Sequence, residues 1–503
     1  MKNKKGERKT IKDMLCKLLT VFLLPALILS GCGNNQAVTD KAVVSEKVSV
    51  DEKTLHMLDE PEILYEPVSM KPSIYVDLVG YVPNGEKVAV IEAGIIPRRF
   101  EIVDVKTGKS VYSGYVHERE CPEDDETLSA IVDFSDFTAE GTYYISADFI
   151  GRSENFDIRS GIYEDLLKAN FGGLYGLRDV TDKSDILSFE SNADVTLDVS
   201  GGWITGEGRL KDVCEGCLAM QDLMLCIEYY PKAFSDDYGT ETSGNKIPDI
   251  LDEVMFEAEW LLKMQNPETG GVYTSVSVVG NEKGEQKRVI MGETTRATAY
   301  FCSSMAKLSY VVKKYDGSFS TKCIEAANLA WKCLEANKDL VDKTQMFRAA
   351  VEMYRATGYK VYSRIIDDYL KDNANKEYTE RIALDGAITY MATTRSTNKQ
   401  YCTQLMEQYM ERTENKSNAS KESRYLVESG DREEAVLLRN LSEILIVNYI
   451  ISNKEYGTIE ENYLHYFCGR NPENKICDSL KNSPDAYAQL MFLLGKLTLM
   501  SSK

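Results

Sequence analysis

The hydrophobic and polar positions of this chain change their period near residue 160. From Ile74 to Ile158, short runs of β-branched and aromatic residues alternate with polar residues and are separated by turn-forming residues. Alternation with a period of two is typical of half-buried strands. The pattern predicts strands at Ile74–Val79, Lys87–Ile91, Phe100–Val105, Ser129–Phe134 and Gly141–Ser146. Strands at this spacing, over about 85 residues, predict a small β-sandwich.

After Tyr163, apolar residues recur at every third or fourth position, which predicts helices to the end of the chain. Roughly a dozen segments show this period. Among them are Glu164–Leu177, Leu210–Tyr229, Asp249–Met264, Thr295–Lys313, Ile324–Ala336, Met346–Thr357, Arg381–Ala392, Glu433–Ile451 and Ala486–Leu499. The second part is therefore predicted to be all-α, although periodicity alone does not give the arrangement of its helices.

The first 31 residues have the order of a secretory signal. A basic segment with seven Lys and Arg precedes the apolar run Leu18–Leu29. The run ends in Leu29-Ser30-Gly31-Cys32, which looks like the lipobox of bacterial lipoproteins. We therefore expect residues 1–31 to be removed and Cys32 to be lipidated, which would make this an extracytoplasmic protein, lipid-anchored at the bacterial cell surface. A transmembrane anchor is less favoured, because the run is short for a span and contains Pro25.

Composition limits the partners of the mature chain. Without residues 1–31 it would carry 52 basic and 77 acidic residues. This negative charge argues against nucleic acid and other polyanions as partners, whereas an uncharged polysaccharide is compatible with it. Residues 32–71 are polar and lack a hydrophobic period, so we expect them to form a flexible spacer between the lipid and the fold.

The cysteines show no disulfide framework, although an exported protein would permit one. Cys214-Glu215-Gly216-Cys217 is the one CxxC, and it has neither a second pair nor a nearby histidine to complete a zinc site. Buried thiols are the favoured interpretation. We predict no metal site and no cofactor.

Three segments carry a resemblance to a known family. They are Gly201–Gly208 (Gly-Gly-Trp-Ile-Thr-Gly-Glu-Gly), Ile247–Glu253 with Trp260–Gln265 downstream, and Tyr463–Pro472 near the C-terminus. In this order they resemble glycoside hydrolase family 9, the inverting cellulases, and the resemblance covers residues 74–500. It implies an immunoglobulin-like β-sandwich at 72–160, followed by an (α/α)6 toroid at 161–503. It also implies β-1,4-linked glucan, or an oligosaccharide from it, as the substrate.

The position of the catalytic base follows from this resemblance. Inverting hydrolysis needs a carboxylate that activates water and a carboxylic acid that protonates the leaving oxygen, about 6.5–9.5 Å apart. In the family the base is the second aspartate of an Asp-Ala-Gly-Asp that follows Gly-Gly-Trp. An ungapped alignment places Thr205 and Gly208 at the two aspartates. A one-residue gap makes Glu207 the candidate base; the alternative is a solvated loop acid, since glutamate is one methylene longer.

The catalytic acid is also displaced. The resemblance puts Lys481 where the family has its glutamate, and Asp485 is the nearest carboxylate. Asp485 is therefore the candidate acid. As an alternative, it follows Ser483-Pro484 and can serve simply as an acidic residue at a helix N-terminus. Only 14 residues separate Pro472 from Tyr487, and the His-His-Arg element that the family carries there is absent from the sequence.

Aromatic rings stack on sugar faces, and Trp203 is the candidate substrate contact, with support of its loop as the equal alternative. Together these patterns predict a membrane-tethered, cellulase-like protein directed at β-1,4-linked glucan, with hydrolysis weak or lost. One alternative is an active inverting hydrolase that uses Glu207 as its base. Another is a non-catalytic scaffold that binds glycan or protein.

Overall fold

The structure is a computed structural model that describes residues 73–119, 128–181, 183–280, 286–373, 376–428, 433–477 and 483–501. The predicted signal peptide, the lipidated Cys32 and the spacer at 32–71 lie outside the described residues, as does Lys481. The predicted fold class is confirmed within the described part: an immunoglobulin-like β-domain precedes an all-α domain built of hairpins of helices.

The N-terminal domain consists of antiparallel strands. They are β1 (Ile74–Tyr75), β2 (Val88–Ala93), β3 (Arg99–Asp104), β4 (Ser110–Arg119), β5 (Leu128–Asp133), β6 (Gly141–Ala147), β7 (Gly151–Arg152) and β8 (Phe156–Ile158). Their order is β1-β2-β5-β4-β3-β6-β7, with β8 paired to β6. The first half of β4 pairs with β3 and its second half with β5, so this strand passes from one sheet layer to the other. In the core between the layers, Tyr81 meets both Phe134 and Phe156 edge to face, and the two phenylalanine rings are tilted against each other.

All five predicted strands are present, but β4 (Ser110–Arg119) was not predicted. Most of its residues are exposed or only partly buried. The sequence therefore lacks the alternation of apolar and polar positions on which strand prediction depends. Pairing with two neighbours stabilises this strand in place of burial of its own side chains.

Twelve helices follow in the described residues. They are α3 (Ile162–Tyr175), α4 (Val213–Tyr229), α5 (Asp249–Lys263), α6 (Thr295–Val312), α7 (Gly317–Ala336), α8 (Lys343–Thr357), α9 (Lys360–Asp372), α10 (Arg381–Ala392), α11 (Lys399–Glu422), α12 (Glu434–Ile451), α13 (Lys454–Phe467) and α14 (Pro484–Ser501). No helix in the described ranges is long and apolar enough to cross a membrane.

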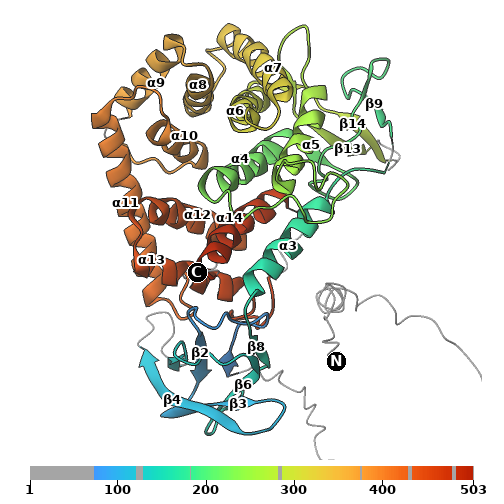
Figure 1. The fold of residues 1–503 in the computed structure, drawn as a ribbon. Coiled ribbons are helices and arrows are strands. Elements are labelled where there is room, and N and C mark those ends of the chain that lie inside the picture. Colours follow the sequence, from blue (N-terminus) through green and yellow to red (C-terminus); the bar gives the residue numbers. More distant parts are fainter. Residues whose placement is uncertain are drawn as a thin grey trace, which may run out of the picture. The chain divides into compact units, whose positions relative to one another are not determined.

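The even-numbered helices form the inner ring of an (α/α)6 toroid. Helix α4 packs on α6, α6 on α8 and α8 on α10, while α12 packs on α14 and α14 on α4 (Figure 1). One odd-numbered helix separates each inner helix from the next along the chain, so the inner helices run in the same direction. Their first turns therefore gather at one end of the ring, which we call the ring mouth.

Short antiparallel strands interrupt the helical domain, so the prediction of helix throughout the region after Tyr163 is wrong for these segments. They are β9 (Ile186–Ser188), β10 (Thr196–Asp198), β11 (Lys211–Asp212), β12 (Val272–Tyr273), β13 (Ser275–Gly280), β14 (Gln286–Ile290) and β15 (Glu293–Thr294). The sequence of β13, Ser-Val-Ser-Val-Val-Gly, is β-branched and alternates, which favours a strand locally. Strands β9 to β11 lie in the connection between α3 and α4, and β12 to β15 lie in the connection between α5 and α6.

Buried polar contacts join the β-domain to the helical domain. His465 on α13 places Nδ1 2.7 Å from the Asp77 carboxylate and Nε2 3.0 Å from the backbone oxygen of Glu86. Arg470, fully buried, donates to the backbone oxygen of Val88 at 3.2 Å. Both ring nitrogens of His465 are thus engaged in contacts between the two domains.

No disulfide joins any two of the nine cysteines within the described residues. Cys217 is buried in α4, and Cys214 is partly buried in its first turn. This agrees with the interpretation of the CxxC as two thiols.

Candidate functional site

The Gly-Gly-Trp segment forms a tight turn that packs against the middle and the C-terminal part of α5. Gly201 and Gly202 both have positive φ, +87° and +77°, a conformation that residues with a Cβ rarely adopt. A Cβ on Gly202 would lie 2.6 Å from Cγ of Trp260. The second glycine is therefore required both by its backbone angle and by the close approach of the indole.

Trp203 is fully buried. Its indole Nε1 donates to Glu253 at 3.2 Å, and its backbone N–H donates to Glu257 at 2.6 Å. Glu253 also pairs with Arg178 at 2.7 Å. Of the two roles considered for Trp203, the geometry favours support of the loop, because the ring has no exposed face on which a sugar could stack.

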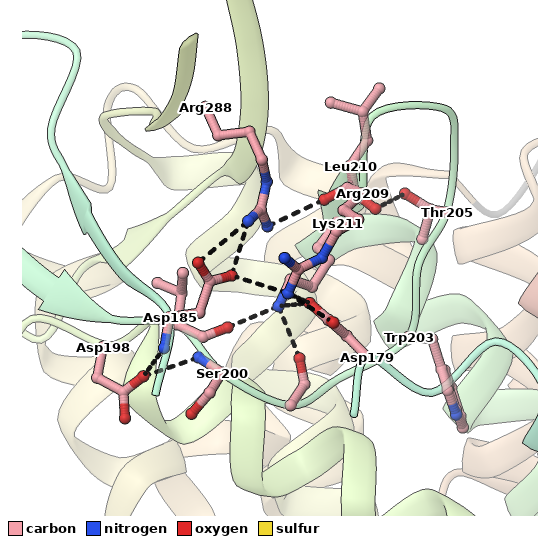
Figure 2. Close-up of polar contacts among 12 residues, drawn as sticks. Asp179, Asp185, Asp198, Ser200, Trp203, Thr205, Arg209, Leu210, Lys211 and Arg288 are labelled. Carbon is pink, nitrogen blue, oxygen red and sulfur yellow. Dashed lines mark hydrogen bonds and ion pairs between the residues drawn. The ribbon is translucent and has the colours of Figure 1, made fainter. Parts of the chain in front are cut away.

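The loop that follows Trp203 is held by a cluster of charged residues (Figure 2). Arg209 donates to Asp179 at 2.7 Å, and Arg288 donates to Asp185 at 2.8 Å. Lys211 lies 2.9 Å from Asp179. Burial opposes ionisation of Asp179, but its bonds from Lys211 and Arg209 hold the pKa of that carboxyl below its usual range. Asp179 therefore stabilises the loop as a carboxylate.

The two expected aspartate positions hold no acid. The backbone N–H of Thr205 donates to the oxygen of Leu210 at 2.8 Å, and Gly208 has a φ of +72°. Glu207 is exposed in the turn between them and forms no hydrogen bond or ion pair with the described residues. No group that the structure describes positions this carboxylate, as a catalytic base would require.

Asp485 is more than a helix N-terminal residue. It lies in the first turn of α14 and accepts from Arg381 at 2.6 Å and from Gln489 at 3.0 Å, both through Oδ2. Arg381 begins α10 and also donates to Asp222 on α4, at 2.6 Å. Asp485 Oδ1 has no hydrogen-bond partner. One oxygen is thus bonded from α10 and α14, whereas the other is buried and has no hydrogen-bond partner among the described residues.

Sequence reasoning missed a second acid at the ring mouth. Glu215 lies in the first turn of α4, where its backbone N–H donates to the capping Asp212 at 2.9 Å. Burial, followed by the carboxylates of Asp212 and Asp485, raises the pKa of Glu215 to about 7. In the sequence, Glu215 lies inside the CxxC, which was interpreted only through its cysteines. An acid within an apolar helical period was the signal that could have found it.

A cavity of about 240 Å³ is lined in part by Arg381 and Gln489, the two residues that donate to Asp485. It lies where α11 packs against both α10 and α12, and five helices line it. Its polar lining includes Arg381, Asp385, Arg412, Asn440 and Gln489. Planar amide, guanidinium and carboxylate groups of this kind are suited to the hydroxyl groups of a sugar.

Comparison with known families matches both domains. The model of glycosyl hydrolase family 9 matches residues 159–476. The model of the cellulase N-terminal ig-like domain matches residues 69–152.

Relatives of known name are similar over part of their length. The chain is 26% identical to Endoglucanase D of Acetivibrio thermocellus over 422 residues, which cover 75% of this chain and 61% of the relative. It is 25% identical to a xyloglucan-specific endo-beta-1,4-glucanase of Bacteroides ovatus over 349 residues, 58% of each chain. The chain therefore spans less than two thirds of the length of these curated relatives.

Solved structures share the fold. A metagenome-derived glycoside hydrolase family 9 endoglucanase superposes with a TM-score of 0.74 at 22% identity, covering 84% of this chain and 98% of that one. A family 9 protein of Bacteroides ovatus gives 0.72 at 19% identity, covering 86% and 99%. These likenesses extend through both domains.

Proposed function

Because the chain belongs to glycosyl hydrolase family 9, we propose that it acts on β-1,4-linked glucan at the bacterial cell surface, hydrolysing it far more slowly than family members with both aspartates. The observation that carries the proposal is the Gly201–Leu210 loop. It keeps the Gly-Gly-Trp turn and its supporting contacts, yet Thr205 and Gly208 stand at the aspartate positions. The supporting framework of the loop is thus retained where the usual base is missing.

The expected loss of rate follows from general acid–base catalysis. A positioned acid or base contributes about 10²–10⁴-fold to the rate. Glu207 is exposed and unsupported, and an unsupported carboxylate spends little time in the geometry that the reaction needs. Two relatives are named as an endoglucanase and an endo-beta-1,4-glucanase, which supports β-glucan as the substrate class.

We expect reducing-sugar release from carboxymethyl-cellulose and mixed-linkage glucan to be at least about 100-fold slower than with Endoglucanase D of Acetivibrio thermocellus. Binding of cello-oligosaccharides, measured by calorimetry, should be retained. The variant Glu207→Gln should hydrolyse at the wild-type rate.

Each other outcome selects an alternative. Fast turnover that disappears in Glu207→Gln would make the protein an active inverting hydrolase with Glu207 as base. If neither turnover nor oligosaccharide binding is detected, the glucan proposal fails and a protein-binding scaffold is favoured.

The surface location depends on Cys32, and we expect a labelled fatty acid to be incorporated into the wild-type chain in a bacterial host. Mass spectrometry should find an acylated Cys32 as the first residue of the mature protein. Cys32→Ala should abolish incorporation, whereas Cys16→Ala, in the segment to be removed, should not. An unmodified Cys32, or labelling that persists in Cys32→Ala, would contradict the lipid anchor.

A further inference from the structure

Two carboxylic acids lie on neighbouring first turns at the ring mouth. Glu215 lies in the first turn of α4 and Asp485 in the first turn of α14, and these two helices pack directly on each other. The Ser483 side chain, just before α14, hydrogen-bonds Glu215. The two acids therefore face the same end of the ring from adjacent helices.

The surroundings of the two acids differ in the way that acid–base catalysis requires. Arg381 and Gln489 both donate to Asp485, contacts that favour the charged carboxylate. Glu215 has no cation partner in the described part of the chain, and its charged neighbours Asp212 and Asp485 are both acidic. Asp485 is thus paired with a cation, whereas Glu215, which has no such partner, is favoured in its protonated form.

A buried arginine marks the mouth as a place that binds a polar ligand. Arg348 on α8 is 2% exposed, and none of its three side-chain nitrogens has a hydrogen-bond partner. Its nearest acid, Asp385 on α10, is 3.9 Å away, and it packs 5.5 Å from the ring centre of Tyr300 on α6. A buried guanidinium with this many unpaired donors is costly, and sugar hydroxyls are groups it can bond.

The 240 Å³ cavity is the second observation that points to a ligand. Arg381 and Gln489, the two residues that bind Asp485, both line it. Asp385, beside Arg348, lines it as well. The two residues that bond Asp485 and the acid nearest to Arg348 thus line one polar cavity.

We infer that Glu215 is the catalytic acid and Asp485 the catalytic base of the slow glucan hydrolysis, an assignment that rests on the proposed function. Asp485 Oδ1 takes a proton from water as the water oxygen bonds to the anomeric carbon. The bond from that carbon to the leaving oxygen breaks, and the Glu215 proton passes to the leaving oxygen. One water is consumed, and the configuration at the anomeric carbon inverts.

Other nearby acids are engaged differently. Asp222 lines the cavity, where it accepts a hydrogen bond from Arg381 at 2.6 Å. Asp212 accepts from the backbone N–H of Glu215 and caps α4. Arg381 is a positioning residue, because it fixes the Asp485 oxygen that does not take the proton.

The acid role is tested with substrates whose leaving groups differ. Glu215→Gln should slow hydrolysis of unactivated cello-oligosaccharides by about 10²–10⁴-fold. With 2,4-dinitrophenyl β-cellobioside, whose leaving group needs no proton, the same variant should retain a rate within about tenfold of wild type. An equal loss on both substrates would overturn the acid role.

The base role is tested by chemical rescue. Asp485→Asn should lose about 10²–10⁴-fold on both substrates, and added azide should restore turnover of the dinitrophenyl substrate by forming a glycosyl azide of inverted configuration. No azide product would overturn the base role. Glu455→Gln is the matched control, because Glu455 is a first-turn acid on the outer helix α13 and should leave the rate unchanged.

The pH dependence gives an independent readout. Wild-type kcat/KM should fall as pH rises through about 7, because Glu215 then loses the proton that it must donate. This alkaline limb should disappear in Glu215→Gln. The charged groups facing Glu215 are Asp212 before α4, Asp485 on α14 and Glu257 on α5.

The assignment and the proposed function fail in different ways. Wild-type turnover that neither variant slows would overturn the pair while leaving the glucan hydrolase in place. A wild-type chain that binds cello-oligosaccharides but does not hydrolyse the dinitrophenyl substrate would also overturn the pair, and would leave only the glucan ligand. Loss of both binding and hydrolysis would remove the proposed function itself.

Discussion

Replacing Lys211 with methionine is expected to lower the free energy of unfolding of the helical domain by about 3–5 kcal/mol. The Nζ of Lys211 is fully buried and lies 2.6 Å from the oxygen of Val199, 2.8 Å from that of Gly201 and 2.9 Å from the Asp179 carboxylate. Methionine fills a similar volume but donates nothing. Two carbonyl oxygens and part of a buried carboxylate would lose their donor. Urea unfolding followed by tryptophan fluorescence measures the change.

Lys263→Met is the matched control. Its Nζ reaches the same loop and donates to the backbone oxygen of Ser200 at 2.8 Å, but its side chain is 36% exposed. Water can replace an exposed donor, so the cost should stay within about 1 kcal/mol. Equal effects of the two substitutions would show that the buried cluster does not hold the Gly-Gly-Trp loop.

Local pattern was enough to predict the fold and the framework of the loop. Alternation of apolar residues identified strands such as Gly141–Ala147, and helical periodicity identified α4 and α14 within a few residues. The Gly201-Gly202 pair also had a local physical reason, since both residues adopt positive φ. Features of this kind depend on residues close together in the chain.

The candidate site could not be predicted in the same way, because its parts are brought together only by closure of the ring. Glu215 and Asp485 are 270 positions apart in sequence and become neighbours because α14 packs on α4. The contact of Arg381 with both Asp222 and Asp485 likewise depends on the order of the inner helices. Of the two partners of Trp203, Glu253 ends the segment Ile247–Glu253, and Glu257 lies outside the segments that carry the resemblance.

The boundary between the two domains is a further feature that sequence did not predict, and Arg470 is its most heavily bonded residue. Its guanidinium donates to the oxygen of Val88 in the β-domain at 3.2 Å. It also donates to the oxygen of Tyr425 at 3.2 Å and to Asn462 at 2.8 and 2.9 Å in the helical domain. Desolvation lowers the pKa of Arg470 to about 10, so it stays charged at neutral pH.

Arg470→Met should therefore destabilise the protein by at least about 3 kcal/mol, since each buried acceptor left unpaired costs about 1–3 kcal/mol. Because the lost bonds reach both domains, calorimetry should show one unfolding transition in wild type and two in the variant. Arg470→Lys keeps the charge but not the planar guanidinium, so its free energy of unfolding should lie between those of the wild type and of Arg470→Met.

The control is Arg424→Met, which removes a bond to Glu92 across the same boundary, at a partly exposed position. It should lower the free energy of unfolding by about 1 kcal/mol or less. A single transition in Arg470→Met, with a loss no larger than that of Arg424→Met, would mean that the remaining contacts at His465 couple the domains without the arginine.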